Sequence, residues 1–243
     1  MRIIRVEHGG TSYYGILEDG LVFRLHQQPG HMEPIPLSEA KVLPLVTPSK
    51  VVCVGLNYKA HAEELGYPLP NMPSFFLKPP SSIIGNGEPI ILPSGMGRIE
   101  HEAELAMVVG KVCRNLTPEE AEESLFGFTC ANDVTAREVQ KVDPLIGHCK
   151  SYDTFCPIGP WIETDLEDIN DLSIRCLVNG EVRQSANTGD MIFRPLDLLC
   201  FLSRVMTLMP GDVILTGTPP GISPIQADDV VQVSIEGIGT LSN

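Results

Sequence analysis

Short apolar runs rich in β-branched residues, separated by Gly and Pro, are the feature that most constrains this fold. Most are five to ten residues long, which suits strands better than helices. Asp19-Gly20 and Asn179-Gly180 each predict a two-residue hairpin turn. We therefore expect an α+β protein that is mostly β. The runs lie at residues 2–6, 12–17, 21–25, 50–56, 74–78, 89–93, 101–110, 126–133, 173–183, 212–217 and 229–237.

Helix signals are fewer, and they predict two helices with clear starts and a third, apolar helix. Each combines a capping residue or a first-turn proline with a following helical segment. The predicted helices begin after Thr117, where Pro118 and Glu120 complete a capping box; after Thr135, where Glu138 repeats the box; and at Pro195, ending before Pro210-Gly211.

The chain of 243 residues is long enough for one large domain with a small appendage. The first three apolar runs form a small β unit, and a segment rich in Pro and Gly, residues 28–50, follows them. We predict a small N-terminal β domain over residues 1–48 and a catalytic domain over residues 49–243.

Acidic residues outnumber basic ones, 31 to 17, for a formal charge of −14. The basic residues form no cluster, so nucleic acid and anionic membranes are unfavourable partners. No segment has the roughly 18 consecutive apolar residues of a membrane span. The acidic runs at residues 117–124 and 163–171 are typical of solvated surface. Only 20% of residues are charged, which suggests that part of the surface is buried in an oligomer.

The seven cysteines form no CxxC pair and are odd in number. Most have apolar neighbours, as small reduced core residues do. They indicate a reducing compartment, and we expect a cytoplasmic protein.

Three carboxylates form the strongest candidate site. Glu102 and Glu104 alternate along one predicted strand, and Asp133 ends another. A solvated strand face would also explain the glutamates, but neighbouring carboxylates repel unless a positive charge lies between them. Oxygen donors without nearby Cys or His pairs favour Mg²⁺, Mn²⁺ or Ca²⁺ over zinc. We predict a divalent metal site with coordination positions left open for substrate.

Six motifs occur in order along the chain: GLNYKAHAEELG (55–66), FFLKPPSSIIGNG (75–87), HEAEL (101–105), NDVTAREVQ (132–140), KSYDTFCPIGP (150–160) and LTGTPPGI (215–222). Together they resemble the fumarylacetoacetate hydrolase family. The resemblance covers residues 50–243 and is strongest to short members that act on acylpyruvates, oxaloacetate or hydroxymuconate-type diacids. The chain departs from the common pattern at Tyr152 and Pro220, which affects substrate identity and not the metal site.

The resemblance implies packed and rolled mixed β-sheets with a few helices, usually in a homodimer. It implies Mg²⁺ or Mn²⁺ on Glu102, Glu104 and Asp133, with Ca²⁺ possible in their place. The implied substrate is a small 2-oxo acid that chelates the metal through its carboxylate and the adjacent oxo group.

The motifs also indicate catalytic and substrate-binding residues. His61 and Glu64 are three residues apart on a predicted helix, so they share a face and can form a dyad, although a surface pair has the same spacing. The resemblance makes that dyad an activator of water and makes Lys150 a stabiliser of an oxyanion or enolate. The positions assigned to substrate binding are Asn57, Tyr58, Lys78, Arg137, Gln140 and Thr218.

We expect a metal-dependent C–C hydrolase of 2-oxo acids, with oxaloacetate-type decarboxylation or diene-dioate isomerisation as alternatives. A non-catalytic protein with a structural Ca²⁺ site is the alternative from another class. Neither a GxSxG motif nor a Cys beside a His/Asp arrangement is present, apart from His148-Cys149, so a Ser or Cys nucleophile is not expected.

Overall fold

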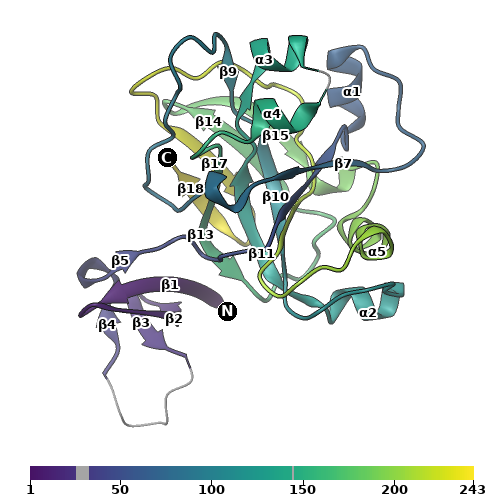
Figure 1. Ribbon diagram of the computed structural model, residues 1–243. Helices are drawn as coiled ribbons and strands as arrows, with labels where there is room; N and C mark the ends of the chain where they lie inside the picture. Colours follow the sequence, from purple (N-terminus) through teal and green to yellow (C-terminus); the bar gives the residue numbers. More distant parts are fainter. Residues whose placement is uncertain (26–32, 144) are drawn as a thin grey trace.

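A computed structural model describes residues 1–25, 33–143 and 145–243, and strands dominate it (Figure 1). The α+β, mostly β fold expected from the sequence is confirmed. The strands are β1 (Arg2–His8), β2 (Thr11–Glu18), β3 (Leu21–Arg24), β4 (Ile35–Pro36), β5 (Lys41–Val42), β6 (Val51–Gly55), β7 (Ser74–Lys78), β8 (Ile83–Ile84), β9 (Ile99–Glu100), β10 (Ala103–Val109), β11 (Leu125–Asn132), β12 (Thr135–Ala136), β13 (Cys156–Glu163), β14 (Ser173–Val178), β15 (Glu181–Asn187), β16 (Val213–Leu215), β17 (Val231–Ile235) and β18 (Gly239–Ser242).

The helices are short. Over the described residues, none is long and apolar enough to cross a membrane. Figure 1 shows α1, α3 and α4 together near the end of β7, with α2 and α5 beside each other elsewhere. The helices are α1 (Lys59–Leu65), α2 (Pro118–Glu122), α3 (Arg137–Val142), α4 (Ile146–Lys150) and α5 (Pro195–Val205), with 3₁₀ turns at Leu37–Glu39, Pro80–Ser82 and Thr188–Asp190.

One large mixed sheet organises the molecule. Its strand order is β4-β3-β2-β1-β13-β11-β10-β16-β6-β7, with β5 beside β1 and β8 beside β13. The β6–β16 and β8–β13 pairs are parallel, and the other pairs are antiparallel. A four-stranded sheet, β15-β14-β17-β18, and a two-stranded ladder, β12-β9, complete the architecture.

Both predicted hairpins are present. Asp19 and Gly20 have φ values of 49° and 77°, and they join β2 to β3 through the Glu18–Leu21 pair. Asn179 and Gly180, with φ values of 53° and 80°, join β14 to β15 in the same way. Asn, Asp and Gly tolerate the left-handed conformation that these turns require, which explains why the signal was reliable.

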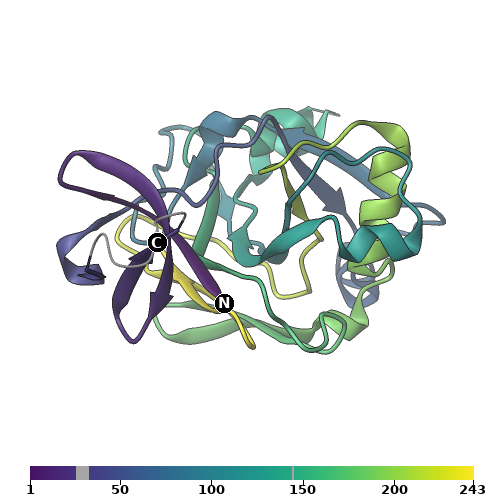
Figure 2. The same ribbon diagram turned by 90° about the horizontal axis from the view of Figure 1, so that it is seen from below.

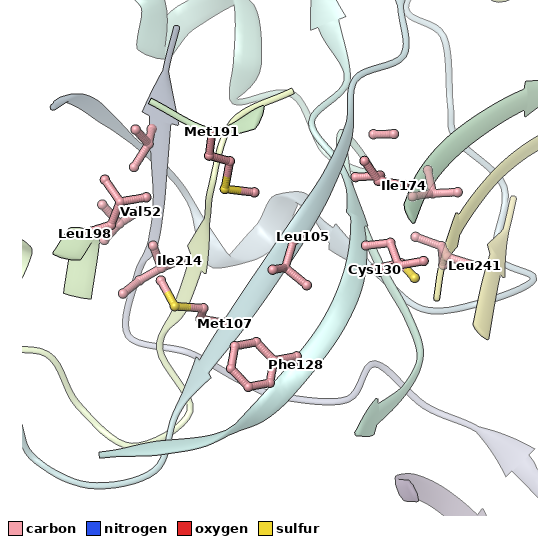
Figure 3. Close-up of a cluster of buried hydrophobic side chains, with 14 of the residues drawn as sticks. Val52, Leu105, Met107, Phe128, Cys130, Ile174, Met191, Leu198, Ile214 and Leu241 are labelled. Atoms are coloured by element: carbon pink, nitrogen blue, oxygen red, sulfur yellow. The ribbon is translucent and has the colours of Figure 1, made fainter. Parts of the chain in front are cut away.

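The core covers both faces of the large sheet. Leu105 and Met107 of β10 pack with β11 and the four-stranded sheet in one cluster (Figure 3), whereas Ala106 and Val108 face a second cluster near β1 and β13. This alternation is the strand period expected for β10. All seven cysteines are buried and free, in agreement with their expected role as core residues.

The N-terminal strands lie at one side of the molecule in both views (Figures 1 and 2). Strand β1 pairs with β13 at Arg2–Glu163 and Ile3–Ile162, so these strands extend the large sheet. The division at residue 48 stays a prediction.

Two local predictions were wrong, while the capping box at Thr117 is confirmed. The helix α3 begins at Arg137 after Ala136, which has no side-chain cap, and Thr135 lies in strand β12. The Thr135 hydroxyl instead donates to the Glu102 carboxylate at 3.2 Å. Residues 89–93 form no strand, and prolines at both ends of that run remove backbone N–H donors.

Candidate metal centre and active site

The register of two antiparallel strands brings the three predicted carboxylates together. Ala103 of β10 is opposite Asn132 of β11, so the adjoining Glu102 and Asp133 meet where the pair ends. The backbone N–H of Asp133 donates to the Glu102 carbonyl at 2.8 Å. One oxygen from each of Glu102, Glu104 and Asp133 lies within 4.8 Å of the other two, and all three side chains are buried. We call these residues the carboxylate cluster.

Three buried or half-buried cations contact the carboxylate cluster. Lys150 Nζ, from the end of α4, donates to Glu102 Oε2 and Asp133 Oδ2, both at 2.6 Å. Lys78 Nζ, from β7, donates to Asp133 Oδ1. Arg137 donates through a terminal nitrogen to Glu102 Oε1. The structure thus places Lys150 and Lys78 against the predicted carboxylates, and their roles toward a substrate stay predictions.

The electrostatics of the cluster are uneven. Burial raises the pKa of Glu102, but the charges of Lys150, Arg137 and, more weakly, His61 outweigh it and lower the pKa. Burial and then the charges of Asp133 and Glu102 raise the pKa of Glu104 well above its usual value. The third carboxylate is therefore not fully compensated by the protein. Buried oxygen donors, one of which has no ion-pair partner among the described residues, fit a hard divalent cation such as Mg²⁺ or Mn²⁺.

Tyr58 adds an unsatisfied polar atom near this cluster. Its side chain is 1% exposed, and its hydroxyl has no hydrogen-bond partner among the described residues. Burial raises the pKa of Tyr58, and the charge of Glu104 adds to the effect. A buried hydroxyl without a partner is costly, and that cost would be offset by any ligand group that reached it.

His61 and Glu64 form the expected dyad on α1. Their Nδ1 and Oε2 atoms are 2.8 Å apart, and His61 is buried. The other Glu64 oxygen accepts from the Gly221 backbone N–H at 3.0 Å, which ties α1 to the GTPPG loop. Because a carboxylate only accepts, the proton of a neutral His61 lies on Nδ1 and Nε2 can take another.

A pocket of about 580 Å³ opens beside these groups. Arg137 and Gln140 of α3 line it, and the same Arg137 contacts Glu102 of the carboxylate cluster. Its other walls come from the end of α1, β9 and the segment before it, α4 and the loop after β16; they include Leu65, Tyr67, Arg98, Glu100, Ile146 and Ile222.

Comparison with known proteins identifies the family. Residues 50–243 match the family model described as the C-terminal domain of fumarylacetoacetate (FAA) hydrolases, and residues 1–44 match one described as an Rv2993c-like N-terminal domain. The chain belongs to the fumarylacetoacetate hydrolase family.

Three relatives in this family have informative names. Human mitochondrial oxaloacetate tautomerase FAHD2A is 42% identical over 86% of this chain and 70% of its own length. The crystal structure of 5-carboxymethyl-2-hydroxymuconate delta-isomerase from Mycobacterium smegmatis is 42% identical with a TM-score of 0.92, over 100% of this chain and 97% of that one. Maleylpyruvate hydrolase from Sphingobium, in complex with manganese(II) and pyruvate, is 30% identical with a TM-score of 0.83, over 100% and 97%.

Two residues assigned to substrate binding have their polar atoms engaged in bonds within the protein. The Asn57 amide donates to the carbonyls of Phe193 and Thr216 at 2.9 and 2.7 Å, and its oxygen accepts from Phe193 N. The Thr218 hydroxyl donates to the Ala103 carbonyl at 2.9 Å. In this member of the family both residues brace the loops around the site.

Three further residues near the site were missed in the sequence. Glu100 continues the alternation of Glu102 and Glu104, which was a usable signal, and it binds Arg137 Nε at 2.5 Å. Thr135 was assigned to a helix cap. Gln184 lies in a polar strand without any signal; its oxygen accepts from Ala103 N at 3.0 Å, and its nitrogen donates to the Thr218 hydroxyl at 2.8 Å.

Proposed function

We propose that this chain is a divalent-metal-dependent enzyme that moves a proton at the carbon next to the oxo group of a 2-oxo acid, as a tautomerase or isomerase. The observation that carries the proposal is the position of three buried carboxylates beside the His61–Glu64 dyad. The oxaloacetate tautomerase and hydroxymuconate isomerase among its relatives, both 42% identical, support this reaction class.

When bound to Glu102, Glu104 and Asp133, a Mg²⁺ or Mn²⁺ ion supplies a Lewis acid that stabilises negative charge on the 2-oxo oxygen. The manganese and pyruvate in the Sphingobium hydrolase support both the ion and the substrate class. Lys150, with its ammonium group buried against Glu102 and Asp133, adds fixed positive charge where the substrate carries its developing charge.

The dyad supplies the base. His61 Nε2 accepts the proton from the substrate carbon, and Glu64, bound to Nδ1, stabilises the imidazolium that results. The same histidine then returns the proton to the other end of the conjugated system. Arg137 and Gln140, joined at 2.8 Å on the pocket wall, orient the substrate carboxylate.

Hydrolysis of a C–C bond, which the sequence favoured, is the second candidate. The observation in its favour is the same His61 Nε2, because a base that takes a proton from carbon can also take one from water. Decarboxylation needs neither proton removal from carbon nor proton removal from water. Assembly as a homodimer and a cytoplasmic location stay predictions from the sequence.

Turnover by chelator-stripped protein, with and without Mg²⁺ or Mn²⁺, tests the proposal. The substrates are oxaloacetate, a 2-hydroxymuconate-type diacid and acetylpyruvate. We expect metal-restored keto–enol or double-bond isomerisation of a diacid, and loss of turnover in Glu64→Gln with metal affinity retained. Cleavage of acetylpyruvate without isomerisation would favour the hydrolase. No turnover of any substrate, with Ca²⁺ still raising the melting temperature, would favour a structural site.

A further inference from the structure

Arg98 marks a part of the pocket that the proposed chemistry does not use. It precedes β9, and its backbone carbonyl accepts a hydrogen bond from the backbone N–H of Arg137 at 2.8 Å. The two arginines are therefore neighbours on the pocket wall. Both guanidinium groups bind Glu100: Arg98 contacts Oε1, and Arg137 Nε contacts Oε2 at 2.5 Å. Glu100 is buried, at 1% exposed, so its carboxylate holds both guanidinium groups from the protein side of the pocket wall.

The two arginines differ in what they have left to offer a ligand. Arg137 binds Glu100, Glu102 and the Gln140 side chain, and its side chain is only 12% exposed. The Arg98 side chain is 51% exposed, and Glu100 is its one ion-pair partner within the described part of the chain. A guanidinium has five N–H donors, so Arg98 retains donors for an anion that enters the pocket.

The charges around the pocket also call for a substrate with two negative charges. Carboxylates and cations are equal in number, four of each, in the network of Arg98, Glu100, Arg137, Glu102, Lys150, Asp133, Lys78 and Glu104, although Glu104 has no ion-pair partner among the described residues. A divalent ion adds two positive charges, which a dianion neutralises. The remaining charges of the wall pair locally, Lys141 with Glu138 at 2.8 Å and Asp143 with His148 at 2.9 Å.

We infer that Arg98 binds the distal carboxylate of a 2-oxo dicarboxylic acid and so selects diacids over monoacids. The inference rests on the proposed function, in which the 2-oxo end of the substrate is held at the carboxylate cluster. Arg137 and Glu100 separate Arg98 from Glu102, and the pocket of about 580 Å³ has room for a chain longer than that of a four-carbon acid.

Two six-carbon acids that differ only in the terminal group provide the test. We would measure the affinities of 2-oxoadipate and 2-oxohexanoate for the Mg²⁺-loaded protein by calorimetry. A charge-assisted bond to Arg98 predicts at least about tenfold tighter binding of the diacid. Arg98→Gln is expected to abolish that ratio while leaving the affinity for 2-oxohexanoate unchanged. Arg98→Lys is expected to retain part of it, because the charge is kept.

The matched control is Lys141→Gln, which removes another cation of the same wall and should leave the ratio as in the wild type. A ratio that survives Arg98→Gln, or that disappears in Lys141→Gln, would overturn the inference. Equal binding of both acids by the wild type would overturn the inference about Arg98 and leave the proposed function standing, since the 2-oxo end would still bind. Binding of neither acid would count against the proposed function as well.

Discussion

Two buried charged clusters in this protein differ in how their carboxylates are satisfied. Asp212 is fully buried and accepts from the Ser49 N–H and hydroxyl, the Lys50 N–H and ammonium, and the Met209 N–H, at 2.5 to 3.1 Å. We call this the Asp212 cluster. In the carboxylate cluster, one oxygen from each of three acids lies within 4.8 Å of the other two. Burial and the acidic neighbours raise the pKa of Glu104.

The difference separates a structural role from a functional one. The Asp212 cluster has one negative charge and enough fixed donors, and it holds the segment before β6 against the turn that precedes β16. In the carboxylate cluster, Glu104 has no ion-pair partner among the described residues and lies beside two other acids, which costs stability without an ion and provides affinity for one. Substitutions in the two clusters should therefore have opposite effects on stability and activity.

The largest expected effect is on activity, from Glu104→Gln. Removal of one metal ligand should lower metal-dependent turnover by about 10³-fold, because Lewis-acid stabilisation contributes several kcal/mol. The melting temperature of the chelator-treated protein should stay the same or rise, because a like charge is removed from a buried site. Steady-state kinetics check the loss of turnover, and thermal denaturation checks the melting temperature. A variant that loses stability without metal and keeps its turnover would contradict the comparison.

The next largest effect, again on turnover, is expected from His61→Ala. In our proposal His61 lies beside the carboxylate cluster and supplies no metal ligand. Turnover should fall by about 10²-fold, the lower end of the usual contribution of a positioned base. Metal affinity, measured by titration with Mn²⁺, should change little. Lys59→Ala is a matched control on the same helix, since Lys59 is exposed and pairs only loosely with Glu63 at 3.9 Å. Equal losses in both variants would indicate a general effect on α1.

A smaller effect, on stability, is expected when metal is added, and it tests whether the ion binds at the carboxylate cluster and not at the Asp212 cluster. An ion that binds only the folded state stabilises it by about 2.7 kcal/mol at a concentration 100 times its Kd. We expect Mn²⁺ to raise the melting temperature of the wild type and of Asp212→Asn equally, and not that of Glu104→Gln. A rise in Glu104→Gln as large as in the wild type would place the ion elsewhere.

The sequence predicted these regions unequally, for physical reasons. Hairpins at Asp19-Gly20 and Asn179-Gly180 depend on local conformational preference, and the structure has both. The alternation in residues 101–110 and the motif around Asp133 also predicted three carboxylates that the structure brings together. Local patterns are thus sufficient where a turn or a strand period decides the geometry.

Contacts between distant segments could not be read in this way. Thr135 had the pattern of a helix cap, but pairing of β12 with β9 turns its hydroxyl toward Glu102. Asn57 belongs to a motif that implies substrate binding, although its amide bonds to backbone more than 130 residues away. The Asp212 cluster gave no signal at all, because all of its donors except the Met209 N–H come from Ser49 and Lys50, 163 and 162 residues earlier in the chain.

The smallest expected effect is on stability, from Asp212→Asn. The amide cannot accept from all of the present donors, so we expect a loss of about 2 kcal/mol at pH 7 with turnover retained. Burial raises the pKa of Asp212, but bonds from Lys50, Met209 and Ser49 lower it overall. A depressed pKa means that the stabilisation is complete above the unfolded value of about 3.9 and is lost as pH falls through the folded value. Urea unfolding at pH 7, 5 and 3 should therefore show the gap between wild type and variant closing only at the lowest pH. A gap that is constant across this range would mean that the charge of Asp212 contributes nothing, and that the two clusters do not differ as argued.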